Sequence, residues 1–287
     1  MSPKQLVWLI TGTSTGIGRE LALAGLNRGE KVIATARNVS KIDDLKQAGA
    51  DILRLDVTES LENLHGTIKQ AVEIHGRIDV LVNNAGYIEV GALEESTPEE
   101  TLQQFNTNIF GALNVTRAVL PYMRAQKSGT IVWFGSIWGW FGAPNSGLYV
   151  ATKFATRGLA ESLQLEVGHL GLRNICFEPG YFRTSFLADG HRQPYNPRIL
   201  DYNEITQRAH NALEAYNGKQ PGDPKKLVSV VLDVVRKEGV AEGREIPVIL
   251  PLGSDCFEGV RSTLEKTTKI LNEWEDVIKG TDFPKDN

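Results

Sequence analysis

Short apolar runs alternate with longer amphipathic stretches along most of the 287 residues. Seven runs are short, rich in β-branched residues and mostly apolar on both faces, which is typical of buried parallel strands. The predicted strands are Leu6–Ile10, Lys31–Thr35, Asp51–Leu55, Val80–Asn83, Thr130–Phe134, Asn174–Phe177 and Ile246–Leu250. Because stretches of helical length separate them, the pattern predicts an α/β fold: a doubly wound parallel sheet of about seven strands with helices on both faces.

Several helix ends are marked by their chemistry. Thr97-Pro98-Glu99-Glu100 fits a capping box with proline at the first helical position, and Asp223-Pro224 opens a second helix in the same way. Gly29 is placed as a left-handed helix stop. Without an internal repeat or linker, the sequence indicates one domain over 1–287, with a core over about 6–250.

Two segments depart from the alternation of strands and helices. Residues 187–223 begin polar and irregular, and then place Ile205, Ala209, Ala212, Leu213 and Tyr216 on one helical face. This insert fits a lid or substrate-binding loop, or alternatively a solvated excursion. Residues 256–287 form a C-terminal extension, with helical spacing at Val260, Leu264, Ile270 and Trp274.

Composition and charge narrow the possible functions. A net charge of −4 without a basic run gives no surface for nucleic acid or an anionic membrane. Two cysteines, Cys176 and Cys256, make a disulfide framework improbable, and no histidine pair has metal-ligand spacing. The first apolar run is too short for a signal peptide or a membrane span, so we expect a cytoplasmic protein.

A glycine-rich turn follows the first predicted strand. It reads Thr11-Gly12-Thr13-Ser14-Thr15-Gly16-Ile17-Gly18 and leads into a helix starting near Arg19. Glycine lets the backbone approach a pyrophosphate, and the helix end offers unpaired N–H groups with a positive dipole. The position of the turn predicts a dinucleotide site of the Rossmann type.

The ends of the next strands fall at the same edge of the sheet. A carboxylate after the second strand would hold the ribose of NAD, but the chain has Ala36-Arg37 there. Arg37 can pair with a 2′-phosphate, which favours NADP(H) over NAD(H), although a surface arginine capping a loop is the alternative. Asp56 is placed to accept from the adenine amino group, and Asn83–Gly86 would line the cleft.

Tyr149 and Lys153 are four residues apart, so a helix places them on one face. A nearby ammonium stabilises a phenolate, which would lower the pKa of Tyr149 and make it a usable acid or base. Ser136 follows a strand and can orient a substrate oxygen toward Tyr149. Asn108 lies within a helical stretch, where asparagine is mildly unfavourable, and this suggests a role.

Together these residues resemble a classical short-chain dehydrogenase/reductase. The ordered set is Thr11–Gly18, Asp56, Asn83–Gly86, Asn108, Ser136, Tyr149, Lys153 and Pro179-Gly180. The resemblance covers roughly Leu6 to Leu250. It implies that Tyr149 is the general acid or base, that Lys153 also binds the nicotinamide ribose, that Ser136 holds the substrate oxygen, and that Asn108 supports a water-linked proton relay.

The resemblance also implies an NADP(H) site and pro-S hydride transfer. The implied cofactor-binding residues are Gly12, Thr13, Ser14, Thr15, Gly16, Ile17, Gly18, Arg37, Asp56, Val57, Asn83, Ala85, Gly86, Tyr149, Lys153, Pro179, Gly180 and Thr184. Two features depart from the family pattern. Thr15 stands where many NADP-preferring members carry a second basic residue, and Pro247–Asp255 lacks the usual glycine-pair ending. The oligomer is therefore left open between a homodimer and a homotetramer.

Aromatic residues flank the predicted site. They are Trp138, Trp140, Phe141, Tyr181, Phe182 and Phe186. Clustered aromatic side chains form an apolar pocket, or alternatively pack the loops onto the core. We expect a medium-sized apolar or aromatic ketone, aldehyde or alcohol, bound by Ser136, Trp138, Trp140, Tyr181 and Phe186.

The resemblance extends to hydroxysteroid-dehydrogenase-like members and ketoreductases that act on steroid-like, retinoid-like or polyketide substrates. It implies an NADP-dependent oxidoreductase acting on a carbonyl/alcohol pair. The alternatives are an NADP(H)-sensing binding protein without turnover, and an isomerase, dehydratase or imine reductase built on the same site.

Overall fold

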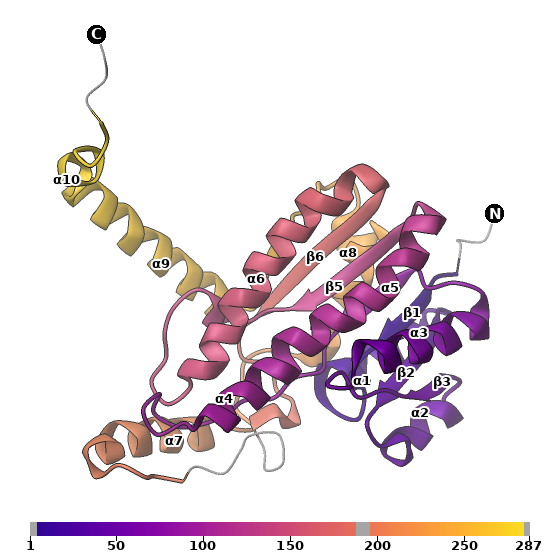
Figure 1. Ribbon diagram of the computed structural model, residues 1–287, viewed down its shortest axis with the longest axis horizontal. Helices are drawn as coiled ribbons and strands as arrows, with labels where there is room; N and C mark the ends of the chain where they lie inside the picture. The colour runs from indigo at the N-terminus through magenta and orange to yellow at the C-terminus, as the bar shows by residue number, and fades with distance from the viewer. Residues whose placement is uncertain (1–4, 188–195, 284–287) are drawn as a thin grey trace.

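A seven-stranded parallel sheet forms the centre of the computed structural model, which describes residues 5–187 and 196–283 (Figure 1). The strands are β1 (Val7–Ile10), β2 (Lys31–Ala36), β3 (Asp51–Arg54), β4 (Val80–Asn83), β5 (Gly129–Phe134), β6 (Leu172–Pro179) and β7 (Ile249–Leu252). Their spatial order is β3-β2-β1-β4-β5-β6-β7, and every pairing is parallel. The predicted doubly wound fold is confirmed.

Strand β1 lies at the point where the chain changes direction across the sheet. Its register pairs Val7 with Lys31 of β2 on one side and Trp8 with Val80 of β4 on the other. The turns after β1 and β4 therefore leave the same edge of the sheet side by side. Ligands of doubly wound sheets bind in the crevice at this switch point.

Ten α-helices within the described residues complete the fold. They are α1 (Gly16–Asn27), α2 (Asp43–Gln47), α3 (Leu61–His75), α4 (Pro98–Phe105), α5 (Ala112–Gln126), α6 (Gly147–Val167), α7 (Asn203–Tyr216), α8 (Pro224–Arg236), α9 (Ser254–Glu273) and α10 (Glu275–Lys279). No helix among residues 5–187 and 196–283 is long and apolar enough to cross a membrane.

The two faces of the sheet bury separate cores. Along β1, Trp8 and Ile10 join the core that packs against α1 and α8, whereas Val7 and Leu9 join the core formed with α3, α5 and α6. This alternation follows from the two-residue period of a strand. It explains why the strand is apolar at every position.

The predicted helix ends are confirmed. Glu100 N donates to Thr97 Oγ1 over 3.1 Å, and Thr97 N donates to Glu100 Oε2 over 2.9 Å, which completes the capping box of α4. Asp223 accepts from Lys225 N at the start of α8. Gly29 adopts a left-handed φ of 81° just after α1.

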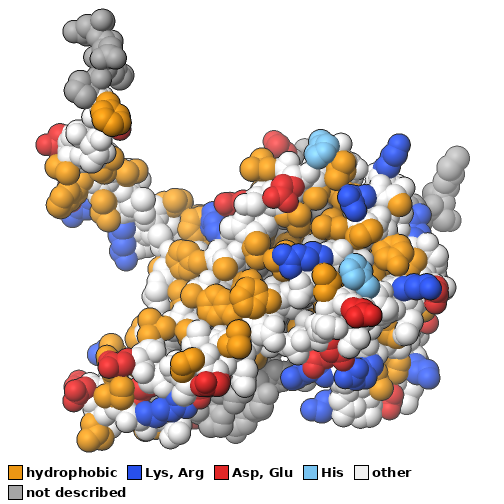
Figure 2. Space-filling view, viewed as in Figure 1, with side chains coloured by type: hydrophobic (Ala, Val, Ile, Leu, Met, Phe, Trp, Pro, Cys, Tyr) orange, Lys and Arg blue, Asp and Glu red, His pale blue; other side chains and the backbone are white. Residues whose placement is uncertain are grey.

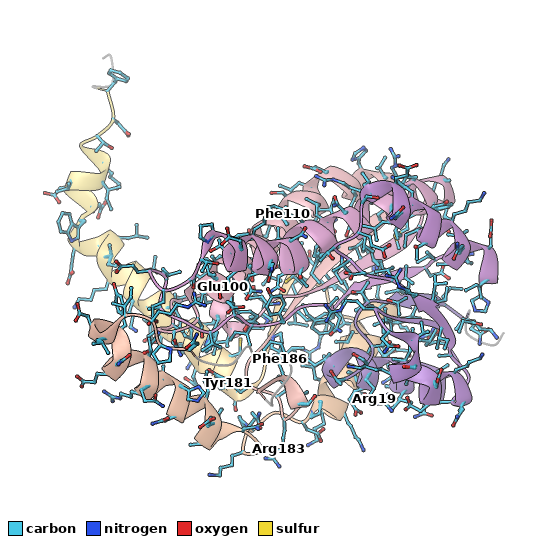
Figure 3. All side chains as sticks on the ribbon, turned by 60° about the horizontal axis from the view of Figure 1, so that its bottom comes forward. Arg19, Glu100, Phe110, Tyr181, Arg183 and Phe186 are labelled. Atoms are coloured by element: carbon cyan, nitrogen blue, oxygen red, sulfur yellow. The ribbon has the colours of Figure 1, made fainter. Side chains whose placement is uncertain are left out.

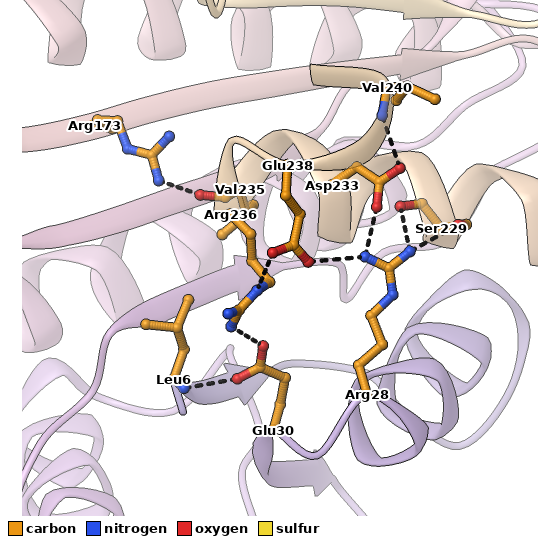
Figure 4. A network of polar contacts seen from close by, with 10 residues as sticks. All are labelled: Leu6, Arg28, Glu30, Arg173, Ser229, Asp233, Val235, Arg236, Glu238 and Val240. Carbon is orange, nitrogen blue, oxygen red and sulfur yellow. Dashed lines mark hydrogen bonds and ion pairs between the residues drawn. The ribbon is translucent and has the colours of Figure 1, made fainter. Parts of the chain in front are cut away.

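A network of charged side chains links α8 to the segments that precede β1 and β2, at the end of the sheet where the strands begin (Figure 4). Arg28 Nη1 lies 2.5 Å from Asp233 Oδ1, and Arg236 pairs with the buried carboxylate of Glu30. Glu30 also accepts from Leu6 N over 2.7 Å. Because a buried charge is tolerated only when paired, this network fixes the position of α8 against α1 and β1.

The last strand lies later than the predicted Ile246–Leu250. Strand β7 begins at Ile249 and includes Pro251. It pairs only with β6, so it is an edge strand, where a proline without an N–H group is tolerated. The hydrophobic pattern alone did not reveal this, since proline usually ends a strand.

The insert and the C-terminal extension are helical. Within 187–223, residues 188–195 lie outside the described residues, and the remainder contains α7. On the predicted face of α7, Leu213 is buried but Ile205 is exposed. In the extension, α9 and α10 project away from the sheet (Figure 1).

Candidate active site

The glycine turn after β1 is shaped by close backbone approach. A Cβ on Gly18 would lie 2.3 Å from Asn84 Nδ2 and 2.6 Å from Gly12 O, so only glycine fits. Gly12 has a left-handed φ of 68°, and a Cβ there would lie 2.9 Å from Ala85 Cα. Helix α1 begins at Gly16 rather than near Arg19, which brings its N-terminus directly into the turn.

Hydrogen bonds tie this turn to the one after β4. Asn84 N and Ala85 N both donate to Thr11 Oγ1, and Asn84 Nδ2 donates to the carbonyl oxygens of Thr11 and Gly12. Asn84 belongs to the run Asn83–Gly86, which the sequence predicts to line the cleft, although it is not among the individually predicted cofactor residues. Its place in the Asn83–Gly86 run was the available signal.

The side chain of Asn83 contacts helix α5 and not the glycine turn after β1. Its Nδ2 atom donates to Thr116 Oγ1 on α5 over 2.9 Å. The side chain therefore anchors β4 to α5.

A groove of about 300 Å³ opens at the start of α1. The glycine turn lines one side of it, and the segment after β6 lines the other. The lining residues are Ser14, Thr15, Gly16, Arg19, Glu20, Arg183, Thr184, Ser185 and Pro224. The groove places the N-terminus of α1 beside two guanidinium groups, of which Arg19 pairs with Asp44 and Arg183 donates to Gln220 O. A helix N-terminus with guanidinium groups beside it is suited to a phosphate.

The other predicted cofactor residues lie at the same edge of the sheet. Arg37 is exposed just after β2. Burial raises the pKa of Tyr87, and the charge of Arg37 opposes that rise in part. Asp56 Oδ1 accepts from Thr58 N and Oγ1, which fixes the turn after β3. Val57 is buried against Gly111, where a Cβ would lie 2.6 Å from Val57 O.

Tyr149 and Lys153 lie on α6, beside one another. Lys153 Nζ lies 5.3 Å from the centre of the Tyr149 ring and donates to Phe134 O over 2.7 Å. Tyr149 is 7% exposed. Ser136, two residues after the end of β5, lies close enough to the phenol to lower its pKa in part. The structure thus brings three of the four predicted catalytic residues together.

The pKa shifts correct one expectation. We expected the Lys153 ammonium to lower the pKa of Tyr149, but burial raises that pKa, and the nearby Ser136 hydroxyl opposes the rise only in part. Burial also lowers the pKa of Lys153 to about 8. Desolvation outweighs the charge effect because both groups are buried. The phenol is therefore protonated at neutral pH.

Asn108 lies in a turn of π-helix, Asn106–Gly111, between α4 and α5. Its Oδ1 atom accepts from Tyr87 N, and its Nδ2 atom donates to Tyr87 O and to Thr152 Oγ1. Thr152 Oγ1 in turn donates to Tyr149 O over 2.7 Å. Asn108 therefore connects the turn after β4 to the helix that carries Tyr149, and π-helical turns often occur at functional sites.

Aromatic rings surround the Tyr149 side chain. Trp138 meets it edge-on with ring centres 5.8 Å apart, and Phe186 packs at 6.0 Å. Tyr181 meets Trp138 edge-on at 6.0 Å. Figure 3 shows Tyr181 and Phe186 close together on the segment after β6. Three of the predicted substrate residues thus form one wall with Tyr149.

Trp140 does not belong to this wall. Its Nε1 atom donates to Glu178 Oε2 over 2.6 Å, and the guanidinium of Arg157 lies 3.7 Å from the centre of its ring. The buried Glu178 carboxylate holds the indole N–H on this side, so the contact of Trp140 with substrate stays a prediction that the aromatic wall does not support.

Phe141 and Phe182 pack loops onto the body. Phe141 lies against Gly259 of α9, and Phe182 lies against Gly222 and the core below α8. For these two rings the loop-packing alternative is confirmed.

Several residues around Tyr149 carry no signal in the sequence that marks them as part of the site. Ile88 and Val90, after β4, are buried with it, and Tyr216 of α7 meets Tyr181 edge-on at 5.0 Å. The predicted helical face of the insert contained Tyr216, but no local pattern connected it with Tyr181. Pro179 and Gly180 lie at the end of β6, where Asp255 leaves no room for a Cβ on Gly180.

Comparison with known proteins identifies the family. The model of the short chain dehydrogenase family matches residues 6–194. The chain belongs to the short-chain dehydrogenase family.

Its relatives include the oxidoreductase BOA17 of Botryotinia fuckeliana, 32% identical over 94% of this chain and 97% of that protein. The 3-ketodihydrosphingosine reductase of Bacteroides thetaiotaomicron is 35% identical over 80% of this chain and 83% of that protein. Among solved structures, a short-chain dehydrogenase from Streptomyces avermitilis has a TM-score of 0.88 and 35% identity, covering 98% of this chain and 100% of that one.

An alcohol dehydrogenase from Thermococcus sibiricus, solved with 5-hydroxy-NADP, has a TM-score of 0.68 and 26% identity, covering 87% of this chain and 96% of that one. The short-chain dehydrogenase is thus an oxidoreductase of a family that uses a nicotinamide cofactor.

Proposed function

We propose that this short-chain dehydrogenase is an NADP(H)-dependent oxidoreductase that interconverts a carbonyl and an alcohol through Tyr149. The observation that carries the proposal is the buried phenol of Tyr149, which lies beside Lys153, has its pKa lowered in part by Ser136, and packs against a wall of aromatic rings. A protonated phenol in a dry pocket is suited to donate a proton to a carbonyl oxygen.

In the reducing direction, the O–H bond of Tyr149 breaks as the O–H bond of the product alcohol forms. Ser136 donates to the same oxygen and holds it toward the phenol. The nicotinamide, when bound, supplies the hydride to the carbonyl carbon. The Lys153 ammonium stabilises the phenolate that remains until a proton returns from solvent through the Asn108 side of α6. Oxidation runs through the same groups in reverse.

The described residues fit a dinucleotide. Gly12 and Gly18 let the turn after β1 pack directly against Asn84 and Ala85, and the groove at the start of α1 offers N–H groups and nearby guanidinium groups to a pyrophosphate. We propose that Asp56 holds the adenine, that Val57, Ala85 and Gly86 line the cleft, and that Pro179, Gly180 and Thr184 shape the nicotinamide pocket.

The proposed preference for NADP(H) over NAD(H) rests on Arg37. It is exposed after β2, where no carboxylate is present to hold a free ribose 2′-hydroxyl. A guanidinium fork pairs well with a phosphate dianion.

The proposed substrate is a medium-sized apolar or aromatic ketone, aldehyde or secondary alcohol. Trp138, Tyr181 and Phe186 support this proposal, together with the buried Ile88 and Val90. One relative is named for the reduction of a keto compound, 3-ketodihydrosphingosine. We further propose that the protein is cytoplasmic and that its binding partner is this small-molecule substrate.

The test measures NADPH and NADH oxidation over a panel of aromatic, aliphatic and polycyclic carbonyls. We expect turnover with NADPH that falls about a thousandfold in Tyr149→Phe. Tyr122→Phe, on α5 away from the pocket, is the matched control and should keep wild-type turnover. Tight NADPH binding without turnover on any carbonyl would instead favour an NADP(H)-sensing protein.

A further inference from the structure

Helices α9 and α10 form an arm that projects from the body of the protein (Figure 1). Within these two helices only Cys256 is buried. Figure 2 shows hydrophobic side chains along the arm, and Phe257, Leu264, Leu271 and Trp274 are each more than half exposed. A helix with an uncovered apolar face is only marginally stable in water, so the arm requires a covering surface.

The base of the arm is held firmly. Cys256 Sγ donates to Glu178 O over 3.2 Å, and Asp255 Oδ2 accepts from Tyr181 N over 2.7 Å. Gly259 lies so close to Phe141 that a Cβ there would be 3.0 Å from the ring. The direction of the arm is therefore fixed by the body, while its far end lies away from the body.

One side of α9 carries an alternating row of charges. A groove of about 780 Å³ runs along this side and is lined by Arg261, Glu265, Lys269 and Glu273, with Phe257, Val260 and Leu264 beside them. The four charged residues are spaced by four positions, which places them on one ridge of the helix. Their signs run plus, minus, plus, minus.

We propose that this ridge binds the same ridge of a second copy of this chain, in antiparallel orientation. With a twofold axis at the level of Thr267, Arg261 lies opposite Glu273 of the second copy and Glu265 lies opposite Lys269. All four charges are then matched, as the self-complementary interface of a twofold dimer requires. Parallel pairing would instead place like charges together.

The same register also matches the apolar ends. Trp274 reaches the level of Val260 of the second copy, near the base of its arm. A partner of uniform charge would meet repulsion at every second position of the ridge, whereas a second copy meets none. The alignment with the solved short-chain dehydrogenase from Streptomyces avermitilis covers 98% of this chain, which leaves too few residues outside it to exclude the whole arm. The proposal does not depend on the proposed function.

A disulfide test distinguishes the two orientations. Residues 261 and 273 are about 18 Å apart along one helix, too far for a bond within a chain. We expect Arg261→Cys combined with Glu273→Cys to form a covalent dimer on mild oxidation, while each single variant stays uncrosslinked. The native cysteines, Cys176 and Cys256, are buried. Crosslinking of the single variants, or none in the double variant, would overturn the antiparallel pairing.

Sedimentation velocity tests the interface without oxidation. Leu264→Lys should abolish one association step, and Glu265→Lys should weaken it about tenfold by placing like charges together twice. Adding Lys269→Glu to Glu265→Lys restores opposite charges across the axis and should restore association. Val240→Lys, at a residue as exposed as Leu264 but on the body, is the control. Unchanged association in Leu264→Lys, or no recovery in the charge swap, would contradict the proposal.

Discussion

The two halves of the cleft are built by different means. The half around the glycine turn consists of backbone approach and side chains bonded to backbone, as in the bonds of Thr11 and Asn84. The half around Tyr149 consists of rings from four separate segments packed against one another. We therefore expect an added Cβ at Gly12 or Gly18 to displace the first half. Loss of one ring should leave the backbone of the second half in place.

The largest effect is expected in the backbone half. Gly18→Ala should lower NADPH affinity about a hundredfold or more, because its Cβ would overlap Asn84 and Gly12 and displace the turn. Binding is measured by fluorescence titration. Gly66→Ala, in α3 with nothing within 4 Å of its Cβ, should bind normally and unfold at a higher temperature. Normal NADPH affinity in Gly18→Ala would disprove the steric account.

Within the same half, Arg37→Ala tests the proposed phosphate contact. We expect the Kd for NADPH to rise about tenfold and the Kd for NADH to stay unchanged, since only NADPH carries the 2′-phosphate. The exposed Arg244→Ala is the control for loss of a surface charge. Equal weakening of both cofactors would remove Arg37 as the basis of the preference.

In the aromatic half, Trp138→Ala should raise KM for a bulky aromatic carbonyl about tenfold and leave a small aliphatic carbonyl nearly unaffected. The indole forms part of the wall beside Tyr149, and its loss removes apolar contact area. Trp140→Ala provides the contrast, because its ring contacts Arg157 and Glu178 rather than the wall. It should lower stability without discriminating between the two substrates.

The smallest effect is expected for Glu178, whose negative charge raises the pKa of Lys153. Burial lowers the pKa of Lys153 to about 8, and the charges of Cys176 and Glu178 oppose this shift. Burial raises the pKa of Cys176 to about 12, so its thiol is neutral and Glu178 is the group that acts. Glu178→Gln should therefore lower the pKa of Lys153 further and keep the hydrogen bond from Trp140.

Activity that requires the Lys153 ammonium is lost as pH rises through its pKa. In Glu178→Gln this alkaline loss of kcat/KM should begin on the order of one pH unit lower than in the wild type. Glu161→Gln removes a half-exposed partner of Arg157 and should leave the profile unchanged. An identical alkaline limb in Glu178→Gln would show that Glu178 does not support the charge of Lys153.

The same contrast explains what the sequence could predict. The glycine turn, Ser136, Tyr149 and Lys153 are local patterns at strand ends or along one helix, so hydrophobic periodicity and spacing were enough to place them. The partner of Trp140 is 38 positions away in the chain, and Tyr216 reaches Tyr181 from the insert. No period in the sequence encodes such contacts, because they depend on how the loops fold over the sheet.

The pKa of Tyr149 was mispredicted for a related reason. The four-residue spacing of Tyr149 and Lys153 gives their proximity, but it does not give the depth at which both are buried. Desolvation is a property of the whole packed pocket, including Ile88 and Val90, and it reverses the direction expected from the charge alone.

The most direct test of the account follows the transferred hydride and the contribution of the proposed proton donor, Tyr149, in one experiment. NADPH deuterated at the transferring position of its nicotinamide is incubated with wild-type protein and an apolar ketone, and the product is examined by mass spectrometry. The account predicts one deuterium at the carbinol carbon with the wild type, and a roughly thousandfold slower appearance with Tyr149→Phe. Product without deuterium, or equal rates in the two proteins, would contradict hydride transfer assisted by Tyr149.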